Sequence, residues 1–426
     1  MNPHGHDRGY PPLYWPKAFW RNSYFGQMID FLQNRADAAW VKLIGRLRFG
    51  VKWHPLIESL AILGVVFMPV MSSWGLLLPL FLLLWITGGP VRNNWAPGAG
   101  WLFLWLVLLI SAFFSPGLRA GLPVLLRFGS WFALAWLIGR TFSAAKSERI
   151  LRYLVYSSLI WLSIGFWQLF SGIPTPQGWL GLEQANIIPT RIYSVFGNPN
   201  IFALYLLSIL IICRYLTVIS TVKIEKYLLA GIISVVLVAL YFTYTRMAWF
   251  LAAVCLGVRF NQNWWRIGLL VAGIITLLLL TFPDFNLRLG SMIHFRDSSL
   301  QYRFQIWRGT GQALLDYWLW GAGPGSFQII YPQYQIGNSV SQHAHQFYLQ
   351  FWLEHGLFGL LAFFAVLKRV LAGRWLARPF TTMNTLAMAP VIFLIYGFSE
   401  TWYIHNFSGG YFWFLIGLFQ ASQEIS

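Results

Sequence analysis

Ionisable side chains enter an otherwise apolar segment at His343-Ala344-His345-Gln346. A neutral histidine titrates near physiological pH, so His345 could act as a general base that takes a proton from an attacking hydroxyl group. The alternative is that His345 only caps the start of the helix that follows. A zinc site made by His343, His345 and His355 is disfavoured, because this spacing is poor for zinc ligands and no cysteine accompanies it. The stretch therefore indicates proton transfer rather than metal chemistry.

Four arginines could supply positive charge for an anionic substrate. Arg191 precedes the turn Gly197-Asn198-Pro199-Asn200, and Arg246 stands at the tip of a tight helical hairpin. Arg303 lies in a long loop, whereas Arg127 lies about seven residues into an apolar run, or roughly 10 Å below its edge. An ionised side chain at such depth costs a few kcal/mol and normally faces a cavity or a partner. Snorkelling to the membrane surface is the alternative for Arg127.

Composition predicts the kind of element that positions these side chains. The chain has 426 residues, of which 57% are hydrophobic and only 10% charged. Soluble proteins carry about 25% charged residues, so an all-α polytopic membrane protein is expected instead. The 24 tryptophans and 19 tyrosines fit aromatic belts at two membrane interfaces. The net charge of +17 is spread over short loops, so it indicates membrane topology and no nucleic-acid partner.

Apolar runs predict about twelve transmembrane helices, with ten and eleven as alternatives. The runs lie at about 56–71, 74–88, 100–114, 120–138, 152–171, 199–213, 227–242, 246–258, 267–282, 347–367, 384–400 and 408–420. Cys213 and Cys255 both fall within such runs, so the sequence implies no disulfide framework.

Loop charge predicts the orientation of these helices. Lysine and arginine concentrate in alternate loops, and the loops between them are nearly uncharged apart from two long ones at 172–198 and 283–345. Under the positive-inside rule the cation-rich loops face the cytoplasm. This predicts a multi-pass bacterial inner-membrane protein with both termini in the cytoplasm and both long loops in the periplasm. Long loops tolerate cations, so any single arginine there could be incidental.

The second long loop has internal structure of its own. The segment from Asp297 to Leu315 predicts an amphipathic helix, and Gly321-Ala322-Gly323-Pro324-Gly325 then interrupts it. A phosphate-binding loop is one interpretation of the glycine-rich run. It matches neither nucleotide fingerprint and follows no strand, so a structural turn is favoured.

The predicted organisation has four parts. Residues 1–52 form a cytoplasmic N-terminal region, either with an interfacial amphipathic helix or as a loosely ordered tail. Residues 53–282 form a first bundle of membrane helices, 283–345 the large periplasmic loop, and 346–426 the C-terminal membrane helices.

Several arginines at one membrane face suit a multiply charged anion, because guanidinium groups bind phosphate oxygens in bidentate fashion. At the periplasmic face, a polyprenyl-linked pyrophosphate sugar is such an anion, and its lipid tail would contact membrane helices. The arginines would stabilise the charge that develops as the sugar–phosphate bond breaks. No metal or other cofactor is expected for this chemistry.

At these positions the chain resembles the O-antigen ligase family, membrane glycosyltransferases that share a Wzy-like C-terminal region. The family pattern is His, then Asn, Ser or Gln, nine residues, and Gly-x-x-Gly, which appears here as His345-Gln346 and Gly356-Leu357-Phe358-Gly359. The resemblance implies a GT-C-like architecture that moves a glycan from a polyprenyl (undecaprenyl) pyrophosphate donor to a hydroxyl of lipid A-core, polysaccharide or protein. It also implies that His345 acts at the acceptor and that Arg191, Arg246 and Arg303 bind pyrophosphate. Arg127 joins this set mainly because of its depth.

Four further residues are expected to support the site. Gln346 stands beside the proposed base, and Glu354 is interpreted as a buried polar partner. Gly356 and Gly359 are interpreted as a helix-packing face, because small residues let membrane helices approach closely.

Within the family, the chain is most similar to a cyanobacterial branch labelled as inorganic-carbon transport proteins. Bicarbonate transport is therefore the alternative function. Transporters usually bind near the membrane midplane at repeat interfaces, whereas the cations here cluster toward one face and no inverted repeat is evident. A scaffold for other membrane proteins is a third interpretation, but it gives no reason for one-sided arginines.

Overall fold

The computed structural model describes residues 54–71, 77–88, 98–113, 115, 118–175, 190–257, 298–375 and 382–422, all within one compact unit, Val51–Ser426. The predicted interfacial helix within 1–52 and the predicted span at 267–282 lie outside the described residues.

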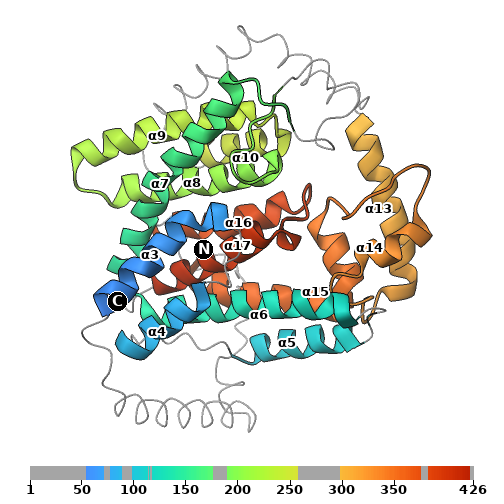
Figure 1. Ribbon diagram of the computed structural model, residues 1–426. Helices are drawn as coiled ribbons and strands as arrows, with labels where there is room; N and C mark the ends of the chain where they lie inside the picture. The colour runs from blue at the N-terminus through green and yellow to red at the C-terminus, as the bar shows by residue number, and fades with distance from the viewer. Residues whose placement is uncertain are drawn as a thin grey trace, which may run out of the picture. The chain divides into compact units, whose positions relative to one another are not determined.

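Every described element is a helix (Figure 1). In chain order the elements are α3 His54–Met71, α4 Leu78–Gly88, α5 Gly98–Phe113, α6 Leu118–Thr141, α7 Ala144–Phe170, α8 Pro199–Ile219, α9 Lys223–Phe242, α10 Arg246–Gly257, α13 Ser298–Tyr317, α14 Phe327–Ile330, the 3₁₀ helix η2 Tyr331–Tyr334, α15 Phe347–Trp375, α16 Thr382–Tyr396, the 3₁₀ helix η3 Trp402–Ile404 and α17 Asn406–Ala421.

Many of these helices have the length and composition of membrane spans. Five segments are long and apolar enough to cross a bilayer: Gly121–Thr141, Ala144–Phe170, Pro199–Ile219, Lys223–Phe242 and Phe347–Lys368. Four shorter apolar helices accompany them: Pro55–Met71, Phe103–Phe113, Arg246–Gly257 and Thr385–Tyr396. The predicted class, an all-helical membrane protein, is confirmed for the described residues. The count of about twelve spans and the GT-C-like architecture stay predictions.

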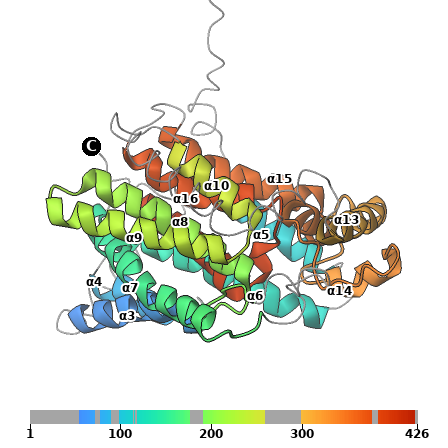
Figure 2. The ribbon, with the colours of Figure 1, turned by 90° about the horizontal axis from the view of Figure 1, so that it is seen from above.

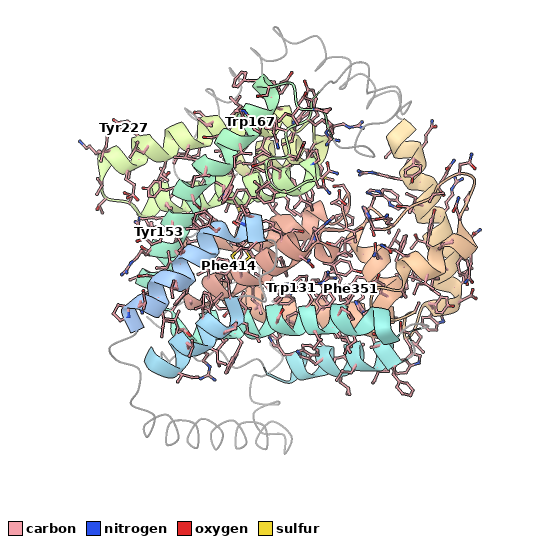
Figure 3. The ribbon with its side chains drawn as sticks, viewed as in Figure 1. Trp131, Tyr153, Trp167, Tyr227, Phe351 and Phe414 are labelled. Atoms are coloured by element: carbon pink, nitrogen blue, oxygen red, sulfur yellow. The ribbon has the colours of Figure 1, made fainter. Side chains whose placement is uncertain are left out.

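The centre of the unit is formed by α8 and α17, which are buried along nearly their whole length. α17 runs beside α6, and a Cβ atom on Gly417 would lie 2.8 Å from the Ala135 carbonyl oxygen. A glycine at this position lets the two backbones approach closely. Figure 3 shows the buried Trp131, Phe351 and Phe414 inside the unit, whereas Tyr227 is 73% exposed and lies at its outer edge.

The two ends of the bundle differ in charge. At one end α6, α8, α10 and α17 begin and α7, α9 and α16 finish, and we call this the site end. Tyr396 at the end of α16 donates its hydroxyl hydrogen to the Asn200 carbonyl at the start of α8 (2.9 Å). The opposite end carries the cation-rich segments at 140–152 and 223–226, where Lys146 pairs with Glu58 at 3.3 Å.

Helix α15 is bent back on itself at Gly356, which has a backbone φ of +69°. The Phe347 and Phe363 rings lie 5.2 Å apart, and the Tyr348 and Phe364 rings lie 5.9 Å apart. In an uninterrupted helix, residues sixteen apart in sequence are separated by about 24 Å. The apolar run predicted at 347–367 is therefore helical and long enough for a span. Its geometry is nevertheless a hairpin of a short first arm, 347–355, and a longer second arm, 357–375.

The glycine-rich run after α13 crosses this hairpin and forms hydrogen bonds with the backbone amides and carbonyls at its bend. The amides of Ala322 and Gly323 donate to the Leu353 and Glu354 carbonyls at 2.7 and 2.9 Å, and Leu357 N donates to the Trp318 carbonyl at 2.8 Å. A broken apolar helix needs such partners, because its freed amides and carbonyls would otherwise stay unpaired. The run is thus a structural element in contact with α15, as the favoured interpretation expects.

The predicted amphipathic helix from Asp297 to Leu315 corresponds to α13, Ser298–Tyr317. Its apolar face contributes Ile306, Ala313 and Leu314 to a buried cluster that also contains Phe327 and Tyr331. Figures 1 and 2 both show α13 and α14 together at one edge of the unit, next to α15. The loop segment therefore has its own small core, and it can present side chains of α13 toward the site end.

Candidate active site

The short loop before α15 holds His345 in a left-handed backbone conformation, with φ of +49°. A non-glycine residue rarely adopts this region, and it persists only when its surroundings impose it. Here Trp307 Nε1 donates to the Ala344 carbonyl at 3.0 Å, and Ala344 N donates to Gln350 Oε1 at 2.8 Å. The rings of His343 and His345 consequently lie side by side, with centroids 4.0 Å apart.

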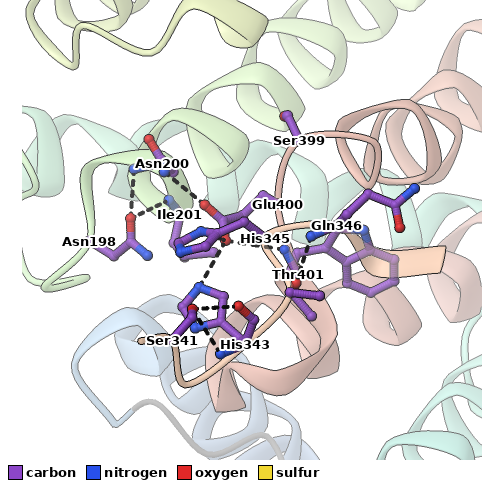
Figure 4. A network of polar contacts seen from close by, with 12 residues as sticks. Asn198, Asn200, Ile201, Ser341, His343, His345, Gln346, Ser399, Glu400 and Thr401 are labelled. Atoms are coloured by element: carbon purple, nitrogen blue, oxygen red, sulfur yellow. Dashed lines mark hydrogen bonds and ion pairs between the residues drawn. The ribbon is translucent and has the colours of Figure 1, made fainter. Parts of the chain in front are cut away.

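A buried carboxylate faces these two imidazoles. Glu400, in the loop between α16 and η3, is 1% exposed. Its Oε1 lies 3.6 Å from His343 Nε2 and 3.8 Å from His345 Nδ1 (Figure 4). Its Oε2 accepts a hydrogen bond from Asn200 Nδ2 at 2.7 Å, and the Thr401 amide donates to Oε1 at 3.1 Å. Three segments far apart in the sequence therefore meet at one carboxylate.

The electrostatics of this cluster favour an ionised Glu400 and a neutral His345. Burial opposes ionisation of the Glu400 carboxyl, but its pKa is well below the usual range because the two imidazoles that face it, His343 first, and then the charge of Arg303 favour the anion. Burial lowers the pKa of His345 to about 3, while Glu400 acts in the opposite direction. A neutral imidazole beside a fixed negative charge can accept a proton, and the resulting cation is then stabilised.

Arg191 is buried and its guanidinium group is engaged by the hairpin tip between α9 and α10. Its Nε donates to the Thr243 carbonyl at 2.9 Å, and its Nη2 donates to Asn200 Oδ1 at 3.0 Å and to Thr245 Oγ1 at 3.3 Å. Burial lowers its pKa to about 10, so the group stays charged at neutral pH. Arg191 thus fastens the hairpin tip to the start of α8, and Asn200 links it to the Glu400 carboxylate.

Arg246 and Arg303 lie close to Arg191. Arg246 is the half-buried first residue of α10. Arg303 projects from the first turns of α13, and its Nη1 donates to the Ser399 carbonyl at 2.8 Å, directly before Glu400. Both guanidinium groups are near enough to lower the pKa of Arg191. Three of the four predicted arginines therefore gather on one side of the carboxylate.

Arg127 approaches from another direction, on α6. Its Nη1 donates to Asn406 Oδ1 at 2.7 Å, and its guanidinium carbon lies 5.4 Å from the centre of the Trp131 ring. It is close enough to His405 to lower the pKa of that imidazole, which burial brings to about 4. Arg127 thus has protein partners near the cluster.

The residues interpreted as supporting the site are mostly part of the α15 hairpin. Gln346 donates its backbone N–H to Thr401 Oγ1 at 3.0 Å, and its side chain accepts from the Leu349 amide, which caps the first arm. Glu354 accepts hydrogen bonds from Tyr403 Oη at 2.8 Å and from Gln350 Nε2 at 3.1 Å.

The two motif glycines have different surroundings. A Cβ atom on Gly356 would overlap the Leu319 carbonyl oxygen, so this glycine provides the bend and the close approach of the glycine-rich run. Gly356 is expected from the sequence to lie on a helix-packing face, whereas here it forms the bend. Gly359 lies close to His355 and to Val107 of α5, so close packing against α5 does apply there.

Two residues of the cluster are not identified as site residues by the sequence alone. In the sequence, Glu400 is only the last residue of an apolar run and Asn200 only part of a turn. Glu400 is one of 13 acidic residues in the chain, and it stands between two strongly apolar runs. A lone acid at the end of a predicted span is a usable signal, because ionised groups are costly there and normally have partners.

The fold and the site define a helical membrane protein with an imidazole–carboxylate cluster, and one comparison with known proteins gave a family match. Residues 230–364 match the family model described as O-antigen ligase. The match runs from α9 into the second arm of α15 and so includes Arg246, Arg303 and His345. A search of curated proteins found no match.

The match covers residues 230–364 of a chain of 426, and it supports an O-antigen ligase-like membrane protein. The finer similarity to the cyanobacterial inorganic-carbon branch stays a prediction.

Proposed function

We propose that this protein transfers a glycan from a polyprenyl-pyrophosphate donor to a hydroxyl acceptor, on lipid A-core, polysaccharide or protein, at the periplasmic face of the inner membrane. One observation carries the proposal: His345 and the buried Glu400 lie 3.8 Å apart, beside Arg303 and the arginines near it. A base and a cationic anion-binding group at the same place are what glycosyl transfer from a pyrophosphate requires.

His345 is the proposed general base. Its Nδ1 faces Glu400, so Nε2 is the nitrogen left to meet an acceptor hydroxyl. The acceptor oxygen attacks the anomeric carbon, its proton passes to His345, and the bond from that carbon to the pyrophosphate oxygen breaks with its electron pair on the leaving group. Glu400 orients the imidazole and stabilises the cation that forms, as a carboxylate does beside a catalytic histidine in other enzymes.

Arg246 and Arg303 are the proposed ligands of the pyrophosphate. Their positive charge would stabilise the leaving group without a divalent metal ion. Arg191 differs from the sequence-based expectation, because its Nε and Nη2 already bind the hairpin tip that carries Arg246. We assign it a positioning role. Arg127, beside Asn406, is proposed to contact a more distant part of the donor or acceptor.

The direct test is a transfer assay with purified chain, lipid-linked donor and acceptor. His345→Ala should abolish transfer, and free imidazole should restore part of it if the missing group is a base. Arg303→Ala should weaken transfer, whereas Arg308→Ala, on the exposed face of α13, is a matched control that should not. In cells, the defective variants should accumulate lipid-linked intermediates. Wild-type surface glycan in His345→Ala would refute the proposal.

The transport alternative makes an opposing prediction. Liposomes that contain only this protein should take up labelled bicarbonate if transport is its function. Glycan transfer without such uptake supports the transferase, and uptake that His345→Ala leaves unchanged would favour the transporter.

A further inference from the structure

The two imidazoles and the carboxylate at the site also have the geometry of a metal site. His343 Nε2, His345 Nδ1 and a Glu400 carboxylate oxygen all lie within 4.8 Å of one another. Both nitrogens are already 3.6 and 3.8 Å from Oε1. Around a tetrahedral zinc ion with bonds of about 2.0–2.2 Å, ligand atoms lie roughly 3.3–3.6 Å apart. The two distances to Oε1 are within a few tenths of an ångström of this spacing, and the two nitrogens, which lie within 4.8 Å of each other, can close the remaining difference by rotation of their side chains.

The imidazole nitrogens that face this point are unsatisfied. His343 Nε2 and His345 Nδ1 are buried and have no hydrogen-bond partner among the residues that the structure describes. His405 Nε2 is buried in the same condition, and its ring lies 6.1 Å from that of His343. Buried polar atoms normally have partners, so such a group of imidazole nitrogens calls for an explanation. A bound cation explains it, because each nitrogen then has a partner.

The surroundings hold the ligands in place. The second oxygen of Glu400 accepts from Asn200 Nδ2 at 2.7 Å, which fixes the carboxylate and leaves Oε1 directed at the histidines. Hydrogen bonds from Trp307 and to Gln350 fix the backbone between His343 and His345. Such outer contacts orient metal ligands and raise affinity in known metal sites.

The residue types select the kind of ion. Two imidazoles and one carboxylate suit zinc and similar transition metals, and a fourth position stays open for water, His405 or substrate. Magnesium and calcium prefer oxygen ligands and would gain little here. The Arg303 guanidinium, which lies close enough to favour the Glu400 anion, also repels any cation. Only an ion that forms strong bonds to imidazole nitrogen can overcome that repulsion.

We propose that His343, His345 and Glu400 form a binding site for Zn²⁺ or a similar transition-metal ion, and that its occupation blocks glycan transfer. A metal on His345 Nδ1 keeps the ring's proton on Nε2, so the imidazole can no longer accept a proton from the acceptor. The proposal that the metal binds is argued from the geometry alone, whereas the proposal that it inhibits rests on the proposed function.

The ligand set differs from the trio weighed on sequence grounds. His355 lies apart from the cluster, with Nδ1 3.4 Å from Ser111 Oγ and its ring against Phe128 and Phe351. Glu400 takes its place, and the chain fold supplies it from a distant segment.

Binding is tested on the full chain in detergent or nanodiscs after treatment with a chelator. We expect one Zn²⁺ per chain by calorimetry, and a Co²⁺ absorption spectrum typical of tetrahedral nitrogen and oxygen ligands. His343→Ala and Glu400→Gln should each weaken binding at least about tenfold. Glu354→Gln is the matched control, since it changes another buried carboxyl without touching the cluster, and it should bind as the wild type does. The proposed site would be refuted if the monodisperse wild type gave neither a heat of Zn²⁺ binding nor Co²⁺ absorption bands. It would also be refuted if the wild type and the three variants bound Zn²⁺ equally.

Inhibition is tested by titrating Zn²⁺ into the transfer assay. Wild-type transfer should fall as the site fills, and Mg²⁺ or Ca²⁺ at the same concentration should leave it unchanged. Activation by Zn²⁺ would overturn the inhibitory role and the metal-independent mechanism, while the site itself would stand. Zn²⁺ binding in a chain that never transfers glycan would instead refute the proposed function and keep the site.

Discussion

Two buried carboxylates lie at the two ends of the first arm of α15, and their surroundings differ. Glu354 and Glu400 are each 1% exposed. Glu354 accepts hydrogen bonds from neutral donors, namely Tyr403, Gln350 and the amides of Gly325 and Phe327, and the Arg127 guanidinium is its charged neighbour.

Glu400 accepts from Asn200 on one oxygen and from the Thr401 amide on the other, and this second oxygen also faces two imidazoles at distances too long for good hydrogen bonds. A satisfied buried network stabilises one structure, whereas an incompletely satisfied one leaves room for a proton, a substrate or an ion. We therefore assign Glu354 to the fold and Glu400 to the chemistry.

The largest expected effect separates these two carboxylates. Glu400→Gln keeps the shape of the side chain but removes the charge that stabilises protonated His345. We expect the kcat of transfer to fall about 10²–10⁴-fold, with the folded protein retained. Glu354→Gln should lower stability by about 1–3 kcal/mol, because an amide cannot accept all the hydrogen bonds made to the carboxylate. Transfer assays and thermal unfolding measure both effects on both variants. The two assignments would be contradicted if Glu354→Gln lowered transfer and Glu400→Gln lowered only stability.

The next largest effect is expected at Gly356, where α15 bends between its two arms. Gly356→Ala must adopt a positive φ and would also meet the Leu319 carbonyl oxygen. The left-handed conformation alone costs roughly 1–2 kcal/mol, and the overlap adds to it, so we expect a loss of about 3 kcal/mol or more.

Gly231→Ala is the matched control for this bend. It lies within α9 with nothing within 4 Å of its added Cβ, so alanine should stabilise the helix by about 0.5–1 kcal/mol. Unfolding in mixed micelles measures both variants. Equal stability of the two would contradict the assigned role of the bend.

Local patterns in the sequence were sufficient for several of these elements. The helix from Asp297, observed as α13, follows from apolar periodicity, and the turn at Arg246 follows from polar residues between two apolar runs. The bend at Gly356 could not be predicted this way, because a continuous apolar run has the same composition whether it is straight or folded back. Its cause is tertiary, since the 319–323 backbone supplies the missing hydrogen bonds.

The site was predictable only in part, for a related reason. His345 and the arginines are conspicuous as charged or ionisable residues among apolar ones, so residue type alone identifies them. The pairing of His345 with Glu400 depends on how separate segments meet, and neither spacing nor periodicity records it. Arg191 shows the same limit, because its contacts with Thr243 and Asn200 depend on how the hairpin tip meets the start of α8.

A smaller effect is expected for the arginines that lie near Glu400. Arg303→Ala removes one charged hydrogen-bond donor, which is worth about 1.5–3 kcal/mol. Transfer should fall roughly 10–100-fold, since each 1.4 kcal/mol is a factor of ten. Arg303→Lys should recover part of the loss, because it restores charge without the fork of donors. Steady-state kinetics with the lipid-linked donor measure these changes, and Arg308→Ala sets the baseline.

The smallest effect is the pH dependence of stability, which tests whether His345 is held neutral. Its pKa of about 3 in the folded chain lies below the ordinary value of 6.5, so between these pH values the unfolded chain binds more protons than the folded one. Stability should therefore be constant above about pH 6.5 and fall as the pH is lowered, by at most about 1.4 kcal/mol per pH unit for this group.

His405 contributes in the same direction. His345→Gln removes one titrating group and should reduce the slope measured by unfolding between pH 6.5 and 4.5, while Gln346→Ala should leave the slope unchanged. An unchanged slope in His345→Gln would mean that the imidazole has the same pKa in the folded and unfolded chains, which would contradict a His345 held neutral by its surroundings.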